Sequence, residues 1–260
     1  MTSSRRRSRL RGWGKLTLLV ISLLQCVASF CLLRLGRKPT DPERAAWLHR
    51  CCRMVFRRLG LSRTAIGQIP GDGLLVSNHL SYLDIVIYGA TLPCVFVSKQ
   101  EVRSWPMLGL LAALGGTVFI DRGSAASAAA ATLRIQELLA DGIVVLIFPE
   151  GTSSDGSSVL RFHPLLFEAA IRGAAPVTAA AIGYSAASHA TEKDLCYYGD
   201  ISFGPHLLET LQLPDIRATI HFTAPVDRYA GRKLAAACTQ QEVAALRGES
   251  SLHSIGAETR

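Results

Sequence analysis

The amino-acid sequence predicts an α/β fold, a sheet covered by helices, preceded by an N-terminal helical segment attached to a membrane. Short apolar runs such as 73–77 and 143–147 alternate with longer stretches of helical composition, as strands and helices do in an α/β domain. The first 64 residues instead combine apolar segments with a strong positive charge. We therefore expect a membrane-anchoring segment at 1–64, a folded domain at 65–247 and a polar, frayed tail at 248–260.

Charge is distributed unevenly along the chain. The formal net charge is +8, but residues 1–64 hold 15 of the 28 Lys and Arg residues and carry a net +13. Residues 65–260 carry a net −5. A nucleic-acid-binding protein usually carries its basic residues on the folded body, so this distribution argues against a nucleic-acid partner. Basic residues beside apolar segments indicate an anionic membrane surface as the partner.

The segment 16–33 is apolar and contains no charged residue. Its eighteen residues are at the lower limit for crossing a bilayer. Basic residues flank it on both sides, so the positive-inside rule leaves open a single span, a re-entrant hairpin or an in-plane hairpin. A signal peptide is disfavoured because no small-x-small cleavage site is followed by an export-like mature sequence.

Residues 41–59 are expected to form an amphipathic helix, with Asp41 as its N-cap and Pro42 at its first position. One alternative packs the helix on the domain and leaves a solvated basic face. The favoured alternative is an interfacial helix, with its apolar side in the acyl layer and its arginines among lipid phosphates. The apolar stripe consists of Leu48, Cys51, Cys52, Val55, Phe56 and Leu59.

In the domain, apolar runs and helical patterns follow one another. Expected strands are 73–77, 95–98, 118–120, 144–148, 177–184 and 219–223. Expected helices are 82–92, 105–114, an alanine-rich one at 125–140 that ends before Asp141-Gly142, then 165–171 and 234–246.

The seven cysteines are irregularly spaced, which indicates reduced thiols in the cytoplasm rather than a disulfide framework. The sequence lacks the Cys-x-x-Cys and His-x-x-x-His spacings of metal sites, so we expect no metal. It also lacks glycine-rich phosphate loops, so we expect no nucleotide cofactor bound in that way.

A histidine and a carboxylate follow the first expected strand. Positions five apart diverge by ~140° on a helix, so His79 must lie in the strand-to-helix turn for Asp84 to fold back and meet it. The carboxylate would then take the Nδ1 proton and leave Nε2 free as a base. The alternative is a buried histidine that merely bonds to a nearby acid.

Two further motifs favour the catalytic alternative for His79 and Asp84. The three motifs in chain order are Asn78-His79-Leu80-Ser81-Tyr82-Leu83-Asp84, Gly115-Gly116-Thr117-Val118-Phe119-Ile120-Asp121-Arg122 and Phe148-Pro149-Glu150-Gly151-Thr152. Over roughly residues 65–225 the chain resembles the 1-acylglycerol-3-phosphate acyltransferases of glycerolipid and phospholipid biosynthesis. The resemblance implies the glycerolipid acyltransferase fold. It also implies a membrane enzyme that transfers an acyl group to a lysolipid, with an acyl-CoA or acyl carrier protein thioester as co-substrate and no cofactor.

The resemblance also implies roles for individual residues. His79 would be the general base and Asp84 would orient it, while Arg122 would hold the acceptor phosphate. Without the resemblance, Arg122 could be a surface arginine paired with Asp121. Acceptor binding is further assigned to Asn78, Glu150, Gly151 and Thr152. The alternative for Pro149-Glu150-Gly151-Thr152 is an ordinary turn after a strand.

Departures from the family pattern concern the acceptor. Ser153 stands where the family often has an arginine, His163 where a basic residue is common, and Ala179 replaces a proline. We still expect 1-acylglycerol-3-phosphate, converted to phosphatidic acid, as the acceptor, with the active site facing the cytoplasm. One alternative is another lysolipid such as lyso-ornithine lipid. A second is a non-catalytic, membrane-bound lipid-binding protein. A serine hydrolase is disfavoured because there is no Gly-x-Ser-x-Gly motif.

Overall fold

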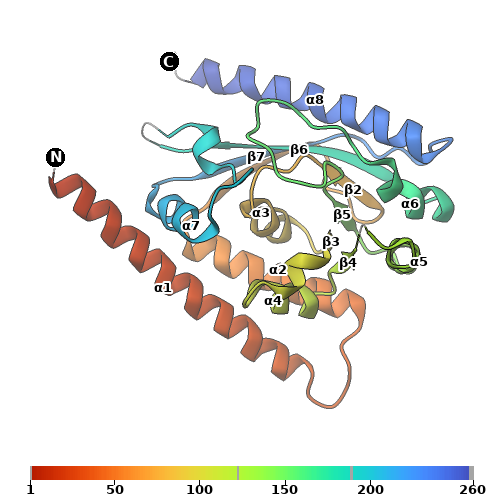
Figure 1. Cartoon of the computed structure of the whole chain (residues 1–260), viewed down its shortest axis with the longest axis horizontal. Coiled ribbons are helices and arrows are strands. Elements are labelled where there is room, and N and C mark those ends of the chain that lie inside the picture. Colours follow the sequence, from red (N-terminus) through yellow and green to blue (C-terminus); the bar gives the residue numbers. More distant parts are fainter. Residues whose placement is uncertain (1, 122, 188–189, 258–260) are drawn as a thin grey trace.

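A computed structural model describes residues 2–121, 123–187 and 190–257, the first and last few of them by their backbone alone (Figure 1). Its centre is a seven-stranded sheet in the order β1-β7-β6-β2-β5-β3-β4, parallel except for the antiparallel pair β6–β7. The strands are β1 (Ser62–Ile66), β2 (Leu74–Ser77), β3 (Val95–Lys99), β4 (Val118–Ile120), β5 (Val145–Ile147), β6 (Val177–Ser185) and β7 (Arg217–Phe222).

Helices cover both faces of the sheet. In Figure 1, α8 runs along one side of the sheet, and α1 and α2 lie on the opposite side. The α-helices are α1 (Thr2–Leu33), α2 (Asp41–Arg58), α3 (Leu83–Thr91), α4 (Leu108–Leu114), α5 (Ala125–Ala140), α6 (Glu168–Gly173), α7 (Phe203–Gln212) and α8 (Arg232–Ala257). Short 3-10 helices are η1 (Gln100–Ser104), η2 (Pro164–Phe167) and η3 (Glu192–Leu195).

The central strand β2 shows why its sequence is continuously apolar. It pairs with β5 on one side and β6 on the other, and all four of its residues are buried. Side chains alternate along a strand, so Leu75 packs in the core beneath α2 and α3, whereas Leu74 and Val76 pack in the core beneath α5 and α8. The strand ends at Ser77, which places the following turn at the carboxyl edge of the sheet, where α/β enzymes bind ligands.

The expected strands and helices of the domain are confirmed, but β1 and α7 were missed. All five residues of β1 are exposed at the sheet edge, so Ser62–Ile66 lacks the apolar run that identifies a strand. The domain boundary expected after residue 64 falls inside this strand, and the division into domains stays a prediction. Helix α7 has a Gly-Pro pair in its first turn, so its sequence does not show a clear helical pattern. Where the sequence predicts a polar, frayed tail after Arg247, the backbone of α8 continues to Ala257.

Helix α2 corrects two details of the sequence analysis. Its N-cap is Thr40, not Asp41, and Thr40 forms a capping box with Glu43. Its apolar stripe is buried against the domain, with Trp47 in edge-to-face contact with Phe30 of α1 at 4.9 Å between ring centroids. The expectation that this stripe enters the acyl layer is therefore wrong, since the stripe is part of the core.

Helix α1 lies along the domain. Its segment Ser8–Leu33 is long and apolar enough to cross a membrane by length and composition. In the structure it packs against α2 and α7, buries Cys26 and Phe30, and bonds through Lys15 Nζ to the carbonyl oxygen of Leu213 at 3.1 Å. Its other face exposes apolar side chains, namely Leu10, Trp13, Leu18, Val20, Ile21, Leu24 and Leu32.

Candidate active site

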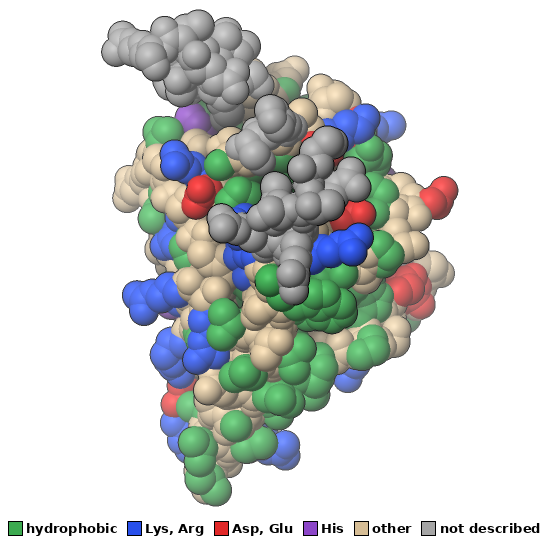
Figure 2. All heavy atoms as spheres, turned by 90° about the vertical axis from the view of Figure 1, so that its left-hand side faces the viewer, with side chains coloured by type: hydrophobic (Ala, Val, Ile, Leu, Met, Phe, Trp, Pro, Cys, Tyr) green, Lys and Arg blue, Asp and Glu red, His purple; other side chains and the backbone are tan. Residues whose placement is uncertain are grey.

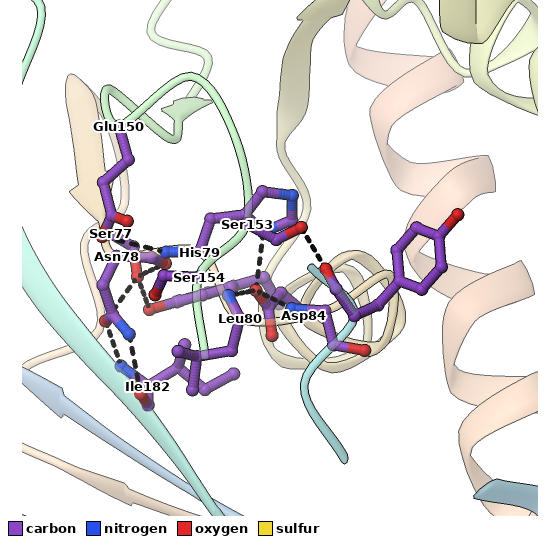
Figure 3. Close-up of polar contacts among 12 residues, drawn as sticks. Ser77, Asn78, His79, Leu80, Asp84, Glu150, Ser153, Ser154 and Ile182 are labelled. Atoms are coloured by element: carbon purple, nitrogen blue, oxygen red, sulfur yellow. Dashed lines mark hydrogen bonds and ion pairs between the residues drawn. The ribbon is translucent and has the colours of Figure 1, made fainter. Parts of the chain in front are cut away.

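The turn between β2 and α3 brings the histidine and the carboxylate together as expected (Figure 3). His79 lies in the turn, and Asp84 is in the first turn of α3. His79 Nδ1 is 2.7 Å from Asp84 Oδ2. The ring of His79 stacks on Phe148, at the end of β5, with 4.2 Å between centroids and 18° between planes. In a neutral imidazole, a proton on Nδ1 that faces the carboxylate leaves the lone pair on Nε2.

The carboxylate of Asp84 is fully buried and surrounded by donors. Its Oδ2 also accepts hydrogen bonds from the backbone N–H groups of Leu80 at 2.8 Å and Ser81 at 3.1 Å. Its Oδ1 accepts a hydrogen bond from the hydroxyl of Tyr184. Burying a carboxylate is costly unless it is hydrogen-bonded, so these donors both stabilise and orient the group.

Glu150 follows β5 and lies beside the same turn. The His79 backbone N–H donates to its Oε1 at 3.4 Å, while Oε2 is buried and has no hydrogen-bond partner among the described residues. Burial raises the pKa of Glu150 to about 8. At neutral pH the side chain is therefore largely protonated and can either donate or accept a hydrogen bond with a ligand.

The residues after Glu150 are held against the histidine turn. Gly151 has φ +73, a left-handed conformation that favours glycine, and its N–H donates to the Phe148 carbonyl at 3.1 Å. Ser154 N–H donates to the His79 carbonyl at 2.9 Å. Thr152 is exposed. The first and third sequence motifs are thus brought together in space.

Asn78 is buried, and its amide bonds to the backbone of β6. Its Nδ2 donates to the Ile182 carbonyl at 3.0 Å, and its Oδ1 accepts from the Ile182 N–H at 2.8 Å (Figure 3). These bonds fasten the turn to the sheet, and a substrate contact for Asn78 stays a prediction. Arg122 lies outside the described residues, so its predicted role also stays a prediction.

Comparisons with known proteins cover the part of the chain that holds this candidate site. The Acyltransferase family model matches residues 64–183, which include His79, Asp84 and Glu150. A lyso-ornithine lipid O-acyltransferase from Rhizobium meliloti is 33% identical over 236 residues, which cover 85% of this chain and 79% of that protein. The chain belongs to the glycerolipid and lysolipid acyltransferase family.

Two other members of the acyltransferase family are similar over different extents. A 1-acyl-sn-glycerol-3-phosphate acyltransferase from Neisseria meningitidis is 40% identical over 115 residues, 44% of this chain and 45% of that protein. The crystal structure of the 1-acyl-sn-glycerophosphate acyltransferase PlsC from Thermotoga maritima superposes with a TM-score of 0.71 at 17% identity. It covers 95% of this chain and 98% of the other. This last likeness confirms the acyltransferase fold expected from the sequence.

Sequence reasoning missed one residue of this candidate site. Tyr184 stands 100 positions after Asp84 along the chain and reaches its carboxylate from the end of β6. The available signal was a tyrosine near the end of an alanine-rich strand, followed by Ser185. That signal does not identify a partner, because strand pairing alone decides which turn β6 faces.

Proposed function

We propose that His79 is the general base of a direct acyl transfer to the free hydroxyl of a lysolipid. The observation that carries this proposal is the 2.7 Å contact between His79 Nδ1 and a fully buried Asp84. Nε2 takes the hydroxyl proton as the oxygen attacks the thioester carbonyl, an ester C–O bond forms, and the C–S bond breaks. The imidazolium then returns the proton to the departing thiolate, so no acyl-enzyme is needed.

Glu150 suits the acceptor side of the reaction. Its Oε2 is a buried polar oxygen without a partner among the described residues, and such an atom is costly unless a ligand satisfies it. The other oxygen of the same carboxyl, Oε1, accepts a hydrogen bond from the His79 backbone N–H. A hydroxyl or headgroup of the lysolipid bonded to Oε2 would be held next to the base.

For the acceptor we propose lyso-ornithine lipid first and 1-acylglycerol-3-phosphate second. The lyso-ornithine lipid enzyme of R. meliloti matches 85% of this chain, whereas the glycerophosphate enzyme of N. meningitidis matches 44%. Ser153 replaces an arginine common in the family, and its hydroxyl donates to the Tyr197 carbonyl, so this position offers no cation. In contrast, the predicted phosphate contact of Arg122 favours 1-acylglycerol-3-phosphate, which is the acceptor expected from the sequence alone.

A panel of acceptors tests this order of acceptor preference. Membranes containing the protein are offered lyso-ornithine lipid or 1-acylglycerol-3-phosphate, each with acyl-CoA or acyl carrier protein thioester, and the products are identified by mass. Because Ser153 supplies no cation for a phosphate, we expect kcat/KM for lyso-ornithine lipid to be roughly tenfold or more above that for the glycerophosphate. The reverse ratio would assign the glycerophosphate as acceptor. The absence of any product from either would favour the non-catalytic lipid-binding alternative.

Membrane attachment is proposed through the exposed apolar face of α1, lying in the plane of the membrane, with the active site on the cytoplasmic side. All seven cysteines are free thiols, which suits a reducing compartment. Arginines of α2 line an open hollow of about 500 Å³, formed by Arg50, Arg53, Met54, Arg57 and Arg58. Figure 2 shows Lys and Arg side chains along one side of a face on which hydrophobic side chains gather lower down. Apolar and cationic surfaces together suit an anionic bilayer.

Acidic substitutions on the outer face of α1 test this attachment. Changing Ile21→Asp together with Leu24→Asp should lower the fraction bound to anionic vesicles, because a carboxylate in the apolar layer costs a few kcal/mol. Binding is measured by flotation at low and high salt, since the arginine contribution should be salt-sensitive. The matched control is Leu133→Asp with Leu234→Asp, two exposed leucines on α5 and α8. Equal flotation of both double variants would contradict attachment through α1.

A further inference from the structure

We propose that Tyr184, Glu192 and Arg247 form a positioning relay that fixes the orientation of Asp84 and, through it, of His79. The inference rests on the proposed role of His79 as the base. The family match ends at residue 183, so all three residues lie beyond it. None of them is assigned a contact with substrate, and their effect is exerted through the carboxylate.

The first link is the hydroxyl of Tyr184. It donates to Asp84 Oδ1, while Oδ2 receives the three donors of the His79 turn. Tyr184 is buried, and burial beside Asp84 holds the pKa of its hydroxyl well above the usual value, so the group remains a donor. Without this hydroxyl, Oδ1 would lose its donor in a dry site, and the carboxylate plane could turn away from Nδ1.

The second link fixes Tyr184 itself. The Tyr184 backbone N–H donates to Glu192 Oε1 at 2.7 Å. Glu192 is paired in a bidentate manner with Arg247, whose Nη1 lies 2.8 Å from Oε1 and whose Nη2 lies 2.6 Å from Oε2. A bidentate pair of this kind constrains direction as well as distance. The carboxylate of Glu192 is therefore held where it can accept the hydrogen bond from the Tyr184 backbone N–H.

Arg247 joins three segments behind the active site. Besides Glu192 of η3, it donates to the Ile182 carbonyl of β6 at 3.2 Å and to the Gly156 carbonyl at 2.9 Å, in the loop that follows Glu150. Its side chain is only 12% exposed. The C-terminal helix α8 therefore contributes a largely buried cation to the frame of the candidate site.

The backbone around the guanidinium leaves room for it. A Cβ atom at Gly183 would lie 2.7 Å from Arg247 Nη1, so only glycine fits there without a shift. A Cβ at Gly156 would lie 3.1 Å from Glu192 Oε2 and 3.3 Å from Arg247 Nη2, and this glycine has φ +80. At two glycine positions a side chain would crowd the Glu192–Arg247 ion pair. This close packing distinguishes the pair from ordinary surface ion pairs, which contribute little to stability.

The relay predicts a defined kinetic pattern. Tyr184→Phe removes one hydroxyl from a buried charged contact and should lower kcat roughly tenfold or more, with both substrate KM values nearly unchanged. Arg247→Met should lower kcat in the same way but less, because it acts one step further away. The double variant should lose less than the product of the two single losses, since both changes release the same carboxylate. Arg247→Lys should recover only part of the loss, because lysine lacks the guanidinium fork.

The test combines these kinetics with the tautomer of His79. Full-length protein labelled with ¹⁵N-imidazole histidine is examined by NMR in detergent, and His79→Ala identifies the resonances of His79. We expect the Nδ1–H tautomer in the wild type and a mixture of tautomers in Tyr184→Phe and Arg247→Met. The matched control is Arg232→Met, which breaks an exposed pair between α8 and Glu168 and should leave both readouts unchanged.

The outcomes separate the relay from the proposed function. Wild-type kcat and an unchanged tautomer in folded Tyr184→Phe would overturn the relay even if acyl transfer is confirmed. If the wild type acylates no lysolipid, the proposed function fails, and the tautomer comparison still decides whether the relay orients His79. Equal losses in Arg232→Met and Arg247→Met would also overturn the relay, because they would reflect loosening of α8 alone.

Discussion

Replacing His79 with alanine is expected to abolish acyl transfer while leaving the protein folded and membrane-bound. The change removes the proposed base, and a positioned general base contributes roughly 10²–10⁴-fold to turnover. Little stability should be lost, because the ring is partly exposed and its side-chain contacts are the Asp84 carboxylate and the Phe148 ring. The measurement is kcat with a lysolipid acceptor and an acyl thioester, accompanied by thermal unfolding and vesicle flotation. Near-normal turnover in a folded His79→Ala protein would remove His79 as the base.

Asp84→Asn is the second substitution with a large expected effect. The volume is kept, but the charge that stabilises the imidazolium during proton transfer is lost, so kcat should again fall roughly 10²–10⁴-fold. An amide also brings an N–H₂ group to a site where the hydrogen-bond partners of Asp84 act as donors: His79 Nδ1, two backbone N–H groups and the Tyr184 hydroxyl. We therefore expect a loss of stability of about 1–3 kcal/mol as well.

Two measurements separate these effects of Asp84→Asn. Urea unfolding gives the change in the free energy of unfolding, and kcat at a temperature well below the transition gives the catalytic loss. The conservative comparison is Tyr184→Phe, which removes a single donor from the same carboxylate and should lower kcat less. Wild-type kcat in a folded Asp84→Asn protein would show that the contact with His79 is only structural.

Local patterns made much of the fold and the first half of the site predictable. The strand 73–77 is continuously apolar because β2 is buried on both faces, and that single fact places His79 at the carboxyl edge of the sheet. A spacing of five residues then allows Asp84 to meet it only if a turn separates them. Both conclusions depend on neighbours in the chain, which a sequence shows directly.

The parts that the sequence could not supply depend on partners far along the chain. The apolar stripe of α2 has the same pattern whether it faces lipid or a protein core, and only the packing of α1 and α3 against it shows that it is core. Asn78 belongs to a motif read as substrate-binding, but its amide is taken by Ile182, 104 residues away. Tyr184 and Arg247 likewise reach the site only through the pairing of β6 and the packing of α8.

Direct attack by the acceptor hydroxyl is tested most directly by the time course of thiol release in the first turnover of the wild-type protein. An acyl thioester is mixed with the protein, with and without the preferred lysolipid, and free thiol and new ester are both quantified. Direct attack by the acceptor hydroxyl predicts no thiol release until lysolipid is present, and then one thiol for each ester formed. A burst of thiol without acceptor, leaving the acyl group on the protein, would contradict it.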